Sequence, residues 1–163
     1  RADLIIISGE RHDDSFDLIT RTLEKMGEVK TVDIAIESSG RHNFGTIGPD
    51  KTPVVTLPGD PIAAYISFEL LVRPMIRTML GTATIHRPSV KAKLEKALTS
   101  SGGDRSYVRA ILSEDGKSVT PLSSQDEQAT LSDANSFIAV PEGETSLTAG
   151  ADVTVVVLER RYL

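Results

Sequence analysis

Apolar and polar positions along the first half of the chain switch between the periods of strands and helices. Residues 4–8 form a continuous apolar run that ends in Ser-Gly, which is typical of a buried parallel strand. Residues 16–26 place apolar side chains on one helical face, with Asp14 or Ser15 expected as the N-cap and Gly27 as the residue that stops the helix. The pattern therefore opens with a strand followed by a helix.

Two more strands and a long helix continue this pattern. Residues 31–36 alternate between apolar and polar side chains, and residues 53–57 form another short apolar run. Residues 61–80 are apolar on nearly every face, which predicts a buried helix that Pro74 kinks or interrupts. Because strands alternate with helices, we expect an α/β fold with parallel strands.

The helical period is lost after Gly81. Period-two alternation and short apolar runs take its place, so the second half predicts a small all-β domain, a barrel. Its expected strands lie at residues 90–95, 107–112 and 153–158, with a hairpin turn at Asp115-Gly116.

The change of pattern predicts two domains, residues 1–83 and residues 84–163. The chain enters its most apolar strand directly after Arg1. We therefore expect it to be part of a longer protein with further structure upstream.

Composition narrows the function classes. The 163 residues include no cysteine, which excludes disulfide scaffolds, cysteine metal sites and thiol catalysis. A net charge of −5 with 4% aromatic residues argues against a nucleic-acid or membrane-surface partner. No apolar run reaches the length of a membrane span. These features predict a cytoplasmic globular protein that binds neither nucleic acid nor membrane.

The turn at residues 57–61 is the sharpest local feature. Gly59 allows a tight turn, Asp60 stands at an N-cap position and Pro61 fits the first turn of a helix. This is either a well-made connection from strand to helix or a place where free backbone N–H groups face an anion such as phosphate. The Asp60 carboxylate competes for those N–H groups, and both interpretations stay open here.

The loop of residues 8–17 is rich in carboxylates. Glu10, Asp13, Asp14 and Asp17 follow a predicted strand, where open α/β sheets bind their ligands, and carboxylate oxygens suit Mg²⁺. The alternative is a solvated loop whose acids cap the helix, and this alternative is favoured for Asp13 and Asp14.

Two loops each contain an Arg-His pair. Arg11-His12 follows the first strand, and Arg41-His42 lies in a second polar loop at residues 37–43. If both loops lie on one sheet edge, the four side chains form a mixed cationic patch. Taken alone, each histidine is typical of a surface residue.

Residues 57–81, LPGDPIAAYISFELLVRPMIRTMLG, closely resemble the molybdopterin molybdenumtransferase family, whose pattern has LPGNP, then TFE, then VRP and a terminal glycine. The resemblance covers essentially the whole chain. It implies the later part of a molybdopterin-binding α/β domain, a partial three-layer α/β/α domain, followed by a C-terminal β-barrel. The further stretches that carry it are residues 3–9, 104–112, 134–143 and 147–153.

The first loop matches the family pattern GGVSxGDxD only in part. Ser8, Gly9 and Asp17 match it, whereas Glu10 stands at the second glycine. The pair Asp14-Ser15 stands where the family has Gly-Asp. A glycine that lets the backbone approach a ligand has thus been replaced by a carboxylate.

The other two loops also depart from the family. Glu37 and Gly40 stand at the two lysines of its KPGKP motif, and Asp60 replaces an asparagine. Two cations that would face an anionic pterin phosphate and molybdate are lost. Either the two Arg-His pairs supply the positive charge from shifted positions, or the site is degenerate.

The resemblance implies that molybdate is inserted into adenylylated molybdopterin with release of AMP, assisted by Mg²⁺, in a protein that is a homodimer at full length. The isolated chain is expected to be inactive. One alternative is a catalytically degenerate paralogue that carries molybdopterin or binds a partner as a scaffold, and another is a barrel interaction module. The candidate site residues are Asp17 as the catalytic residue, Asp13 and Asp14 as metal ligands, and Ser8, Gly9, Glu10, Arg11, His12, Arg41, His42, Pro58, Gly59, Asp60 and Pro61 as substrate-binding residues.

Overall fold

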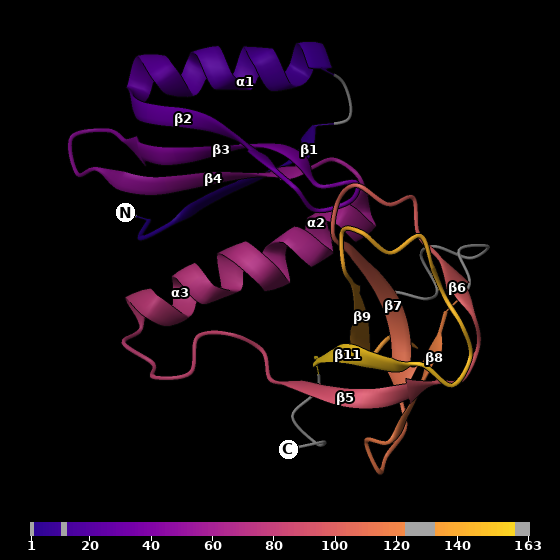
Figure 1. Cartoon of the computed structure of the whole chain (residues 1–163). Helices are drawn as coiled ribbons and strands as arrows, with labels where there is room; N and C mark the ends of the chain where they lie inside the picture. The colour runs from indigo at the N-terminus through magenta and orange to yellow at the C-terminus, as the bar shows by residue number, and fades with distance from the viewer. Residues whose placement is uncertain (1, 11–12, 123–132, 159–163) are drawn as a thin grey trace. The chain divides into compact units, whose positions relative to one another are not determined.

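The computed structural model describes residues 2–10, 13–122 and 133–158, and divides the chain into two compact units, Arg1–Gly81 and Thr82–Leu163 (Figure 1). Along these described stretches, we find no helix with the length and apolarity that crossing a membrane requires.

The first unit is built on a four-stranded sheet with the order β1-β4-β3-β2. Only β1 and β4 run parallel, and the two other pairs of neighbours are antiparallel. The expectation of parallel strands is therefore wrong for two of the three pairs of neighbouring strands. The strands are β1 (Ile5–Glu10), β2 (Gly27–Ile34), β3 (Gly40–Ile47) and β4 (Thr52–Pro58).

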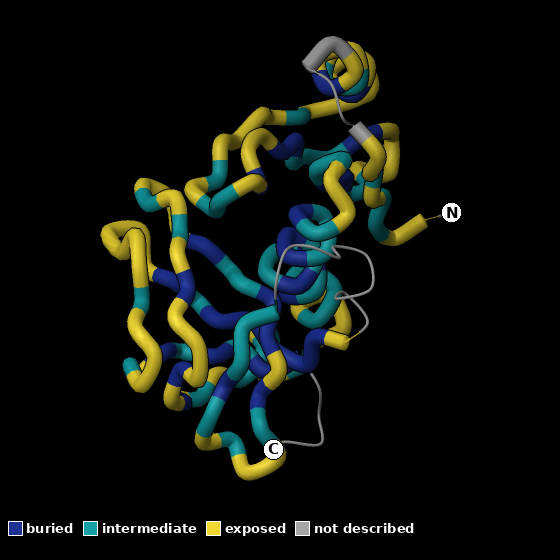
Figure 2. Tube along the Cα trace, turned by 90° about the vertical axis from the view of Figure 1, so that its right-hand side faces the viewer, coloured by how far each residue is buried: buried dark blue, intermediate teal, exposed yellow. Residues whose placement is uncertain are grey.

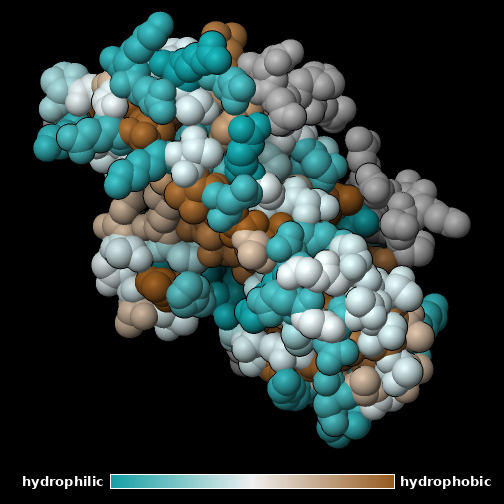
Figure 3. Space-filling view, turned by 45° about the horizontal axis from the view of Figure 1, so that its top comes forward, coloured by the Kyte–Doolittle hydropathy of each residue, from teal (hydrophilic) through white to brown (hydrophobic). Residues whose placement is uncertain are grey.

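Both faces of this sheet contact helical segments. Leu23 of α1 (Asp13–Met26) packs in one apolar cluster with Val54 of β4. The next residue of β4, Val55, packs in a second cluster with Val72, at the end of the π-helical segment η1 (Phe68–Val72). The helices α2 (Pro61–Ser67) and α3 (Arg73–Met79) flank η1 directly. Mainly hydrophilic side chains cover the top of this unit, where α1 lies (Figure 3).

Pro74 interrupts regular helical hydrogen bonding as expected. The backbone N–H of Arg73 donates to the carbonyl of Phe68, five residues earlier, which is the π-helical pattern. Pro74 then enters the first turn of α3, where its missing N–H costs nothing. The predicted helix thus continues from α2 through η1 into α3, and its hydrogen-bond pattern changes from α to π in η1.

The predicted start of α1 is wrong, whereas its predicted end at Met26 is confirmed. The helix begins at Asp13, so Asp14 and Ser15 lie inside its first turn and do not cap it. Gly27 begins β2, and its φ is not left-handed. A Cβ added there would lie 2.1 Å from the carbonyl oxygen of Thr46 on β3. Glycine is therefore required by the close approach of the two strands.

The second unit contains a closed barrel with the order β11-β5-β8-β7-β9, which confirms the predicted all-β half. Its interior is filled by apolar side chains from every strand, seen as buried stretches in Figure 2. A small two-stranded sheet of β6 (Leu98–Thr99) and β10 (Ser146–Leu147) accompanies the barrel. The barrel strands are β5 (Ser89–Leu94), β7 (Ser106–Leu112), β8 (Ser118–Pro121), β9 (Ser136–Val140) and β11 (Asp152–Val157).

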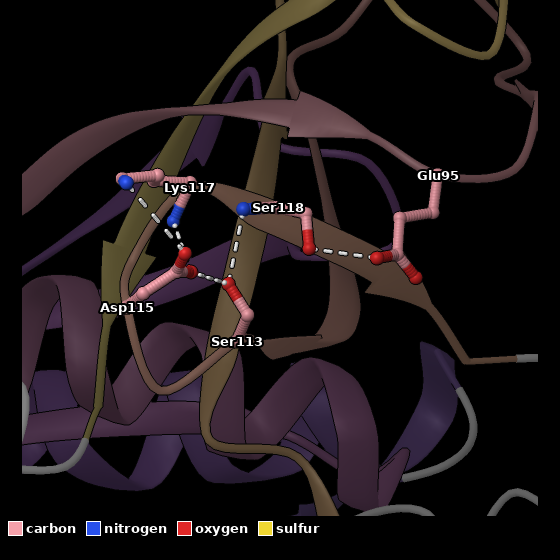
Figure 4. A network of polar contacts seen from close by, with 5 residues as sticks. All are labelled: Glu95, Ser113, Asp115, Lys117 and Ser118. Atoms are coloured by element: carbon pink, nitrogen blue, oxygen red, sulfur yellow. Dashed lines mark hydrogen bonds and ion pairs between the residues drawn. The ribbon is translucent and has the colours of Figure 1, made fainter.

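The predicted hairpin at Asp115-Gly116 joins β7 to β8, with Gly116 at a left-handed φ of 69°. Asp115 accepts hydrogen bonds from the hydroxyl of Ser113 at 2.7 Å and the backbone N–H of Lys117 at 3.0 Å, which lower its pKa (Figure 4). These bonds close the turn on its exposed side, so this polar network serves the barrel itself.

The chain as a whole is mostly β with few helices, and a complete three-layer α/β/α domain is not present in it. The predicted α/β class is therefore met only in part. The closed barrel is the half of the expectation that the structure confirms.

Candidate functional site

Three loops of the first unit leave from one edge of its sheet. Glu10 at the end of β1 pairs with Pro58 at the end of β4, so the loops that follow these parallel strands start side by side. Strand β3 runs in the opposite direction and begins with Gly40, which pairs with Ile34 at the end of β2. The loops at residues 8–17, 35–40 and 58–61 therefore share the edge where open α/β sheets bind ligands.

Asp60 caps the helix α2 as predicted. Its carboxylate accepts hydrogen bonds from the backbone N–H groups of Ile62 at 3.0 Å and Ala63 at 2.8 Å, and Pro61 occupies the first turn. Two N–H groups that an anion would need are thus already bonded. The geometry favours the capping interpretation of this turn over a phosphate cradle.

Arg41 lies at the start of β3 with its side chain half exposed. Its guanidinium carbon is 4.5 Å from the ring centroid of Phe16 on α1. One guanidinium nitrogen is 3.6 Å from the carboxylate of Asp17, which is too long for a good hydrogen bond. An exposed ion pair of this kind contributes less than about 1 kcal/mol, so an anionic ligand can compete with Asp17 for the arginine.

His42 does not join Arg41 in a cationic patch, and the expectation of a surface histidine is wrong. The side chain is fully buried, with Nδ1 2.7 Å from the carbonyl oxygen of Thr56 and Nε2 2.8 Å from Oγ of Ser39. Burial lowers the pKa of His42, and the hydrogen bond to Thr56 opposes that effect only in part. The imidazole is therefore neutral near pH 7 and supplies no positive charge.

Asn43 is buried and hydrogen-bonded in the same way. Its backbone N–H donates to the Thr56 hydroxyl at 2.8 Å, and its amide bonds to Thr20 on α1 at 2.9 Å and to Thr31 on β2 at 2.8 Å. We did not predict these positioning residues, nor Ser39 and Ser67, from the sequence. Apart from Ser39 and His42, which are three residues apart, these bonded partners lie 12 to 28 residues apart, so local spacing does not reveal them.

The remaining predicted residues occupy the same edge or lie outside the described part. Ser8 and Gly9 are exposed at the end of β1, where Gly9 has a left-handed φ of 106°. Pro58 and Gly59 are half-buried at the end of β4. Arg11 and His12 lie outside the described residues, and so do the side chains of Glu10, Asp13 and Asp14.

A magnesium site is not assembled by the residues that the structure describes. Within residues 2–10, 13–122 and 133–158, no three His, Asp or Glu side chains come together as metal ligands. Asp17 faces Arg41, and the proposed ligands Asp13 and Asp14 are not described beyond their backbone. The metal ligands therefore stay a prediction.

Known proteins resemble this chain in both sequence and fold. Residues 91–158, within the barrel unit, match the model of the MoeA C-terminal region (domain IV). Molybdopterin molybdenumtransferase 1 of Mycobacterium tuberculosis is 31% identical over 97% of this chain and 39% of its own length. The crystal structure of a molybdopterin biosynthesis MoeA protein from Pyrococcus horikosii is 30% identical, with a TM-score of 0.78 over 97% of this chain and 38% of that one. Over nearly its whole length, the chain is thus similar to members of the molybdopterin molybdenumtransferase family.

The resemblance noted in the sequence is thereby confirmed. Molybdopterin molybdenumtransferase of Bacillus subtilis is 29% identical over 97% of this chain and 37% of its own length. The chain thus spans about two fifths of the length of these curated relatives. Its relatives carry names from molybdenum cofactor biosynthesis.

Proposed function

We propose that this chain acts in molybdenum cofactor biosynthesis as part of a longer protein that inserts molybdate into adenylylated molybdopterin and releases AMP. Its first unit would be the C-terminal part of the family's molybdopterin-binding α/β/α domain. The observation that carries the proposal is the meeting of three family loops at one sheet edge, with Gly9, Gly59 and Arg41 among them.

Arg41 is the described cation best placed to bind an anionic substrate group. A guanidinium presents parallel N–H donors that fit two oxygens of a phosphate or of molybdate. The Phe16 ring supports the guanidinium by lying 4.5 Å from its carbon atom. Gly9 lets the backbone come close to the ligand because it has no side chain there.

Molybdate-dependent AMP release by the full protein tests this proposal. We expect Arg41→Ala to lower the rate at least about tenfold, because one charge-assisted hydrogen bond is worth roughly 1.5–3 kcal/mol. Arg21→Ala, which removes an exposed arginine from α1, is the matched control and keeps the native rate. Equal rates for the two variants would count against an anion site at this edge of the sheet.

A degenerate paralogue that binds molybdopterin or a protein partner without turnover is the second candidate. Glu37 and Gly40 remove two family cations, and Asp17 already neutralises part of the Arg41 charge. One charge at 4 Å is worth roughly 4 kcal/mol at an effective dielectric constant of about 20, before solvation costs. Binding of molybdopterin without AMP release in the native protein, and no gain of release in Glu37→Lys, would favour this candidate.

The homodimer and the role of Mg²⁺ are predictions from the family resemblance, and the cytoplasmic location is a prediction from composition. We also expect residues 1–163 alone to turn over little or no substrate, because they span only about two fifths of the enzymes that they match.

A further inference from the structure

A line of three buried polar side chains connects the β2–β3 loop to helix α2. Oγ of Ser67 lies 2.8 Å from Oγ of Ser39, which lies 2.8 Å from Nε2 of His42. His42 and Ser67 are fully buried, and Ser39 is 4% exposed. We call these three residues the Ser39–His42–Ser67 network. It lies directly behind the loop in which family members carry two lysines.

The direction of every hydrogen bond in this network is determined. The carbonyl of Thr56 can only accept, so Nδ1 of His42 carries the proton and Nε2 of the neutral ring accepts. The hydroxyl of Ser39 therefore donates to Nε2, and its oxygen accepts from the hydroxyl of Ser67. Burial lowers the pKa of His42, which keeps the ring in this neutral form.

The network holds a backbone segment that is unfavourable on its own. Ser38 and Gly40, on either side of Ser39, both have a left-handed φ, of 61° and 59°. A non-glycine residue keeps such a conformation only where surrounding contacts impose it. The Ser39 backbone N–H also bonds to the carbonyl of Ile36 at 2.9 Å. Ser39 is thus fixed by both its backbone and its hydroxyl.

Arg41 follows this fixed segment and directly precedes His42. Successive strand side chains point to opposite faces, so His42 bonds to Ser39, which bonds to Ser67 of α2, while Arg41 packs on Phe16 of α1. We propose that the Ser39–His42–Ser67 network positions Arg41 for binding an anionic group at this sheet edge, an inference that rests on the proposed function. The three residues act through Arg41 and do not touch the ligand.

Binding of AMP to the full chain, followed by calorimetry, tests the proposal. Ser39→Ala and Ser67→Ala each delete one hydroxyl of the network, and we expect AMP to bind about fivefold more weakly to both. Ser67→Thr keeps the hydroxyl, and threonine is the residue of the family's TFE pattern, so this variant retains native affinity. Thr22→Ala is the matched control, because it removes an exposed helix hydroxyl that bonds only to its own helix.

Nitrogen NMR of the His42 ring provides the second measurement. The native chain shows a proton on Nδ1, and this tautomer persists in Ser67→Thr. A variant whose melting temperature and tautomer stay native while its AMP affinity falls supports positioning, because a merely structural role would not move affinity alone.

Two outcomes overturn the proposal and can be told apart. Loss of AMP binding in Arg41→Ala, together with native affinity in Ser39→Ala and Ser67→Ala, excludes the positioning role and leaves the proposed function standing. Native affinity in Arg41→Ala removes the anion site at this edge, and the proposed function fails with it.

Discussion

Arg41 of β3 stacks on the ring of Phe16 of α1, with its guanidinium carbon 4.5 Å from the ring centroid. A cation over an aromatic face gains about 0.5–1 kcal/mol at an exposed site. The contact restricts a long side chain that would otherwise sample many rotamers. The arginine is thereby held at the sheet edge before any ligand arrives.

Asp17→Asn is expected to strengthen phosphate and AMP binding by a few-fold, because it removes the carboxylate that lies 3.6 Å from Arg41. The gain should be larger at low salt than at 0.5 M salt, since exposed charges are screened. Calorimetric titration at both salt concentrations measures it. Glu24→Gln, which removes an exposed carboxylate of α1, is the control. If Asp17 instead acts as the catalytic residue, turnover by the full protein falls while binding rises.

Two substitutions of Asp60 distinguish its role in capping helix α2 from the effect of its charge on AMP binding. Asp60→Ala should lower the free energy of unfolding by about 1 kcal/mol, because two backbone N–H groups lose their acceptor. Asp60→Asn keeps a capping oxygen and restores the family residue, so it should retain stability and raise AMP affinity by removing a negative charge. Urea unfolding and AMP titration of the two variants check both effects. Weaker AMP binding in Asp60→Asn would contradict the assigned edge.

Gly27→Ala should destabilise the chain by about 1–3 kcal/mol, because the new Cβ would lie 2.1 Å from a β3 carbonyl oxygen that belongs to the backbone. Gly143→Ala is the matched control, since a Cβ there meets no atom within 4 Å. Urea unfolding midpoints measure both. Equal midpoints would mean that β2 and β3 separate at little cost.

His42 should make stability depend on pH. Its folded-state pKa is lowered, so below about pH 6.5 the unfolded chain binds more protons than the folded chain. This contribution is fully present above about pH 6.5 and is lost as pH falls toward the folded-state pKa, with a slope of at most about 1.4 kcal/mol per pH unit.

Urea unfolding of the native chain and of His42→Gln between pH 5 and 8 measures this slope. His42→Gln should be flatter than the native chain over the acidic part of the range. His86→Gln, which alters an exposed histidine, should follow the native curve. A native slope in His42→Gln would assign the pH dependence to other groups.

Strands and helices with an apolar period were predictable from the sequence, whereas β3 was not. The barrel strands alternate cleanly because one face is buried, and β4 and α1 are recognisable for the same reason. Strand β3 instead buries His42 and Asn43, whose polar atoms bond mainly to partners distant in the chain, such as Thr56 and Thr20. Burial through long-range hydrogen bonds leaves no hydrophobic period to detect. The hairpin with β2, and hence the antiparallel part of the sheet, was missed for this reason.

The candidate site was predictable at the level of loops but not of side chains. The turn at residues 57–61 specifies its own geometry, so the capping role of Asp60 followed from local residue types. The contrast between Arg41 and His42 did not, because it depends on which face of an unrecognised strand each one occupies. Two adjacent polar residues looked equivalent in sequence and have opposite environments in the fold.

The alternation of Arg41 and His42 on β3 also guards against misfolding. If β3 slipped by one residue against β4, the guanidinium would enter the space that the imidazole fills, and the imidazole would face solvent. A guanidinium in that interior, where His42 meets a carbonyl and a hydroxyl, would lack a carboxylate partner at a cost of several kcal/mol. A sheet with a shifted register is thereby disfavoured. Arg41 is exposed at this edge only when β3 pairs with its neighbours in the native register.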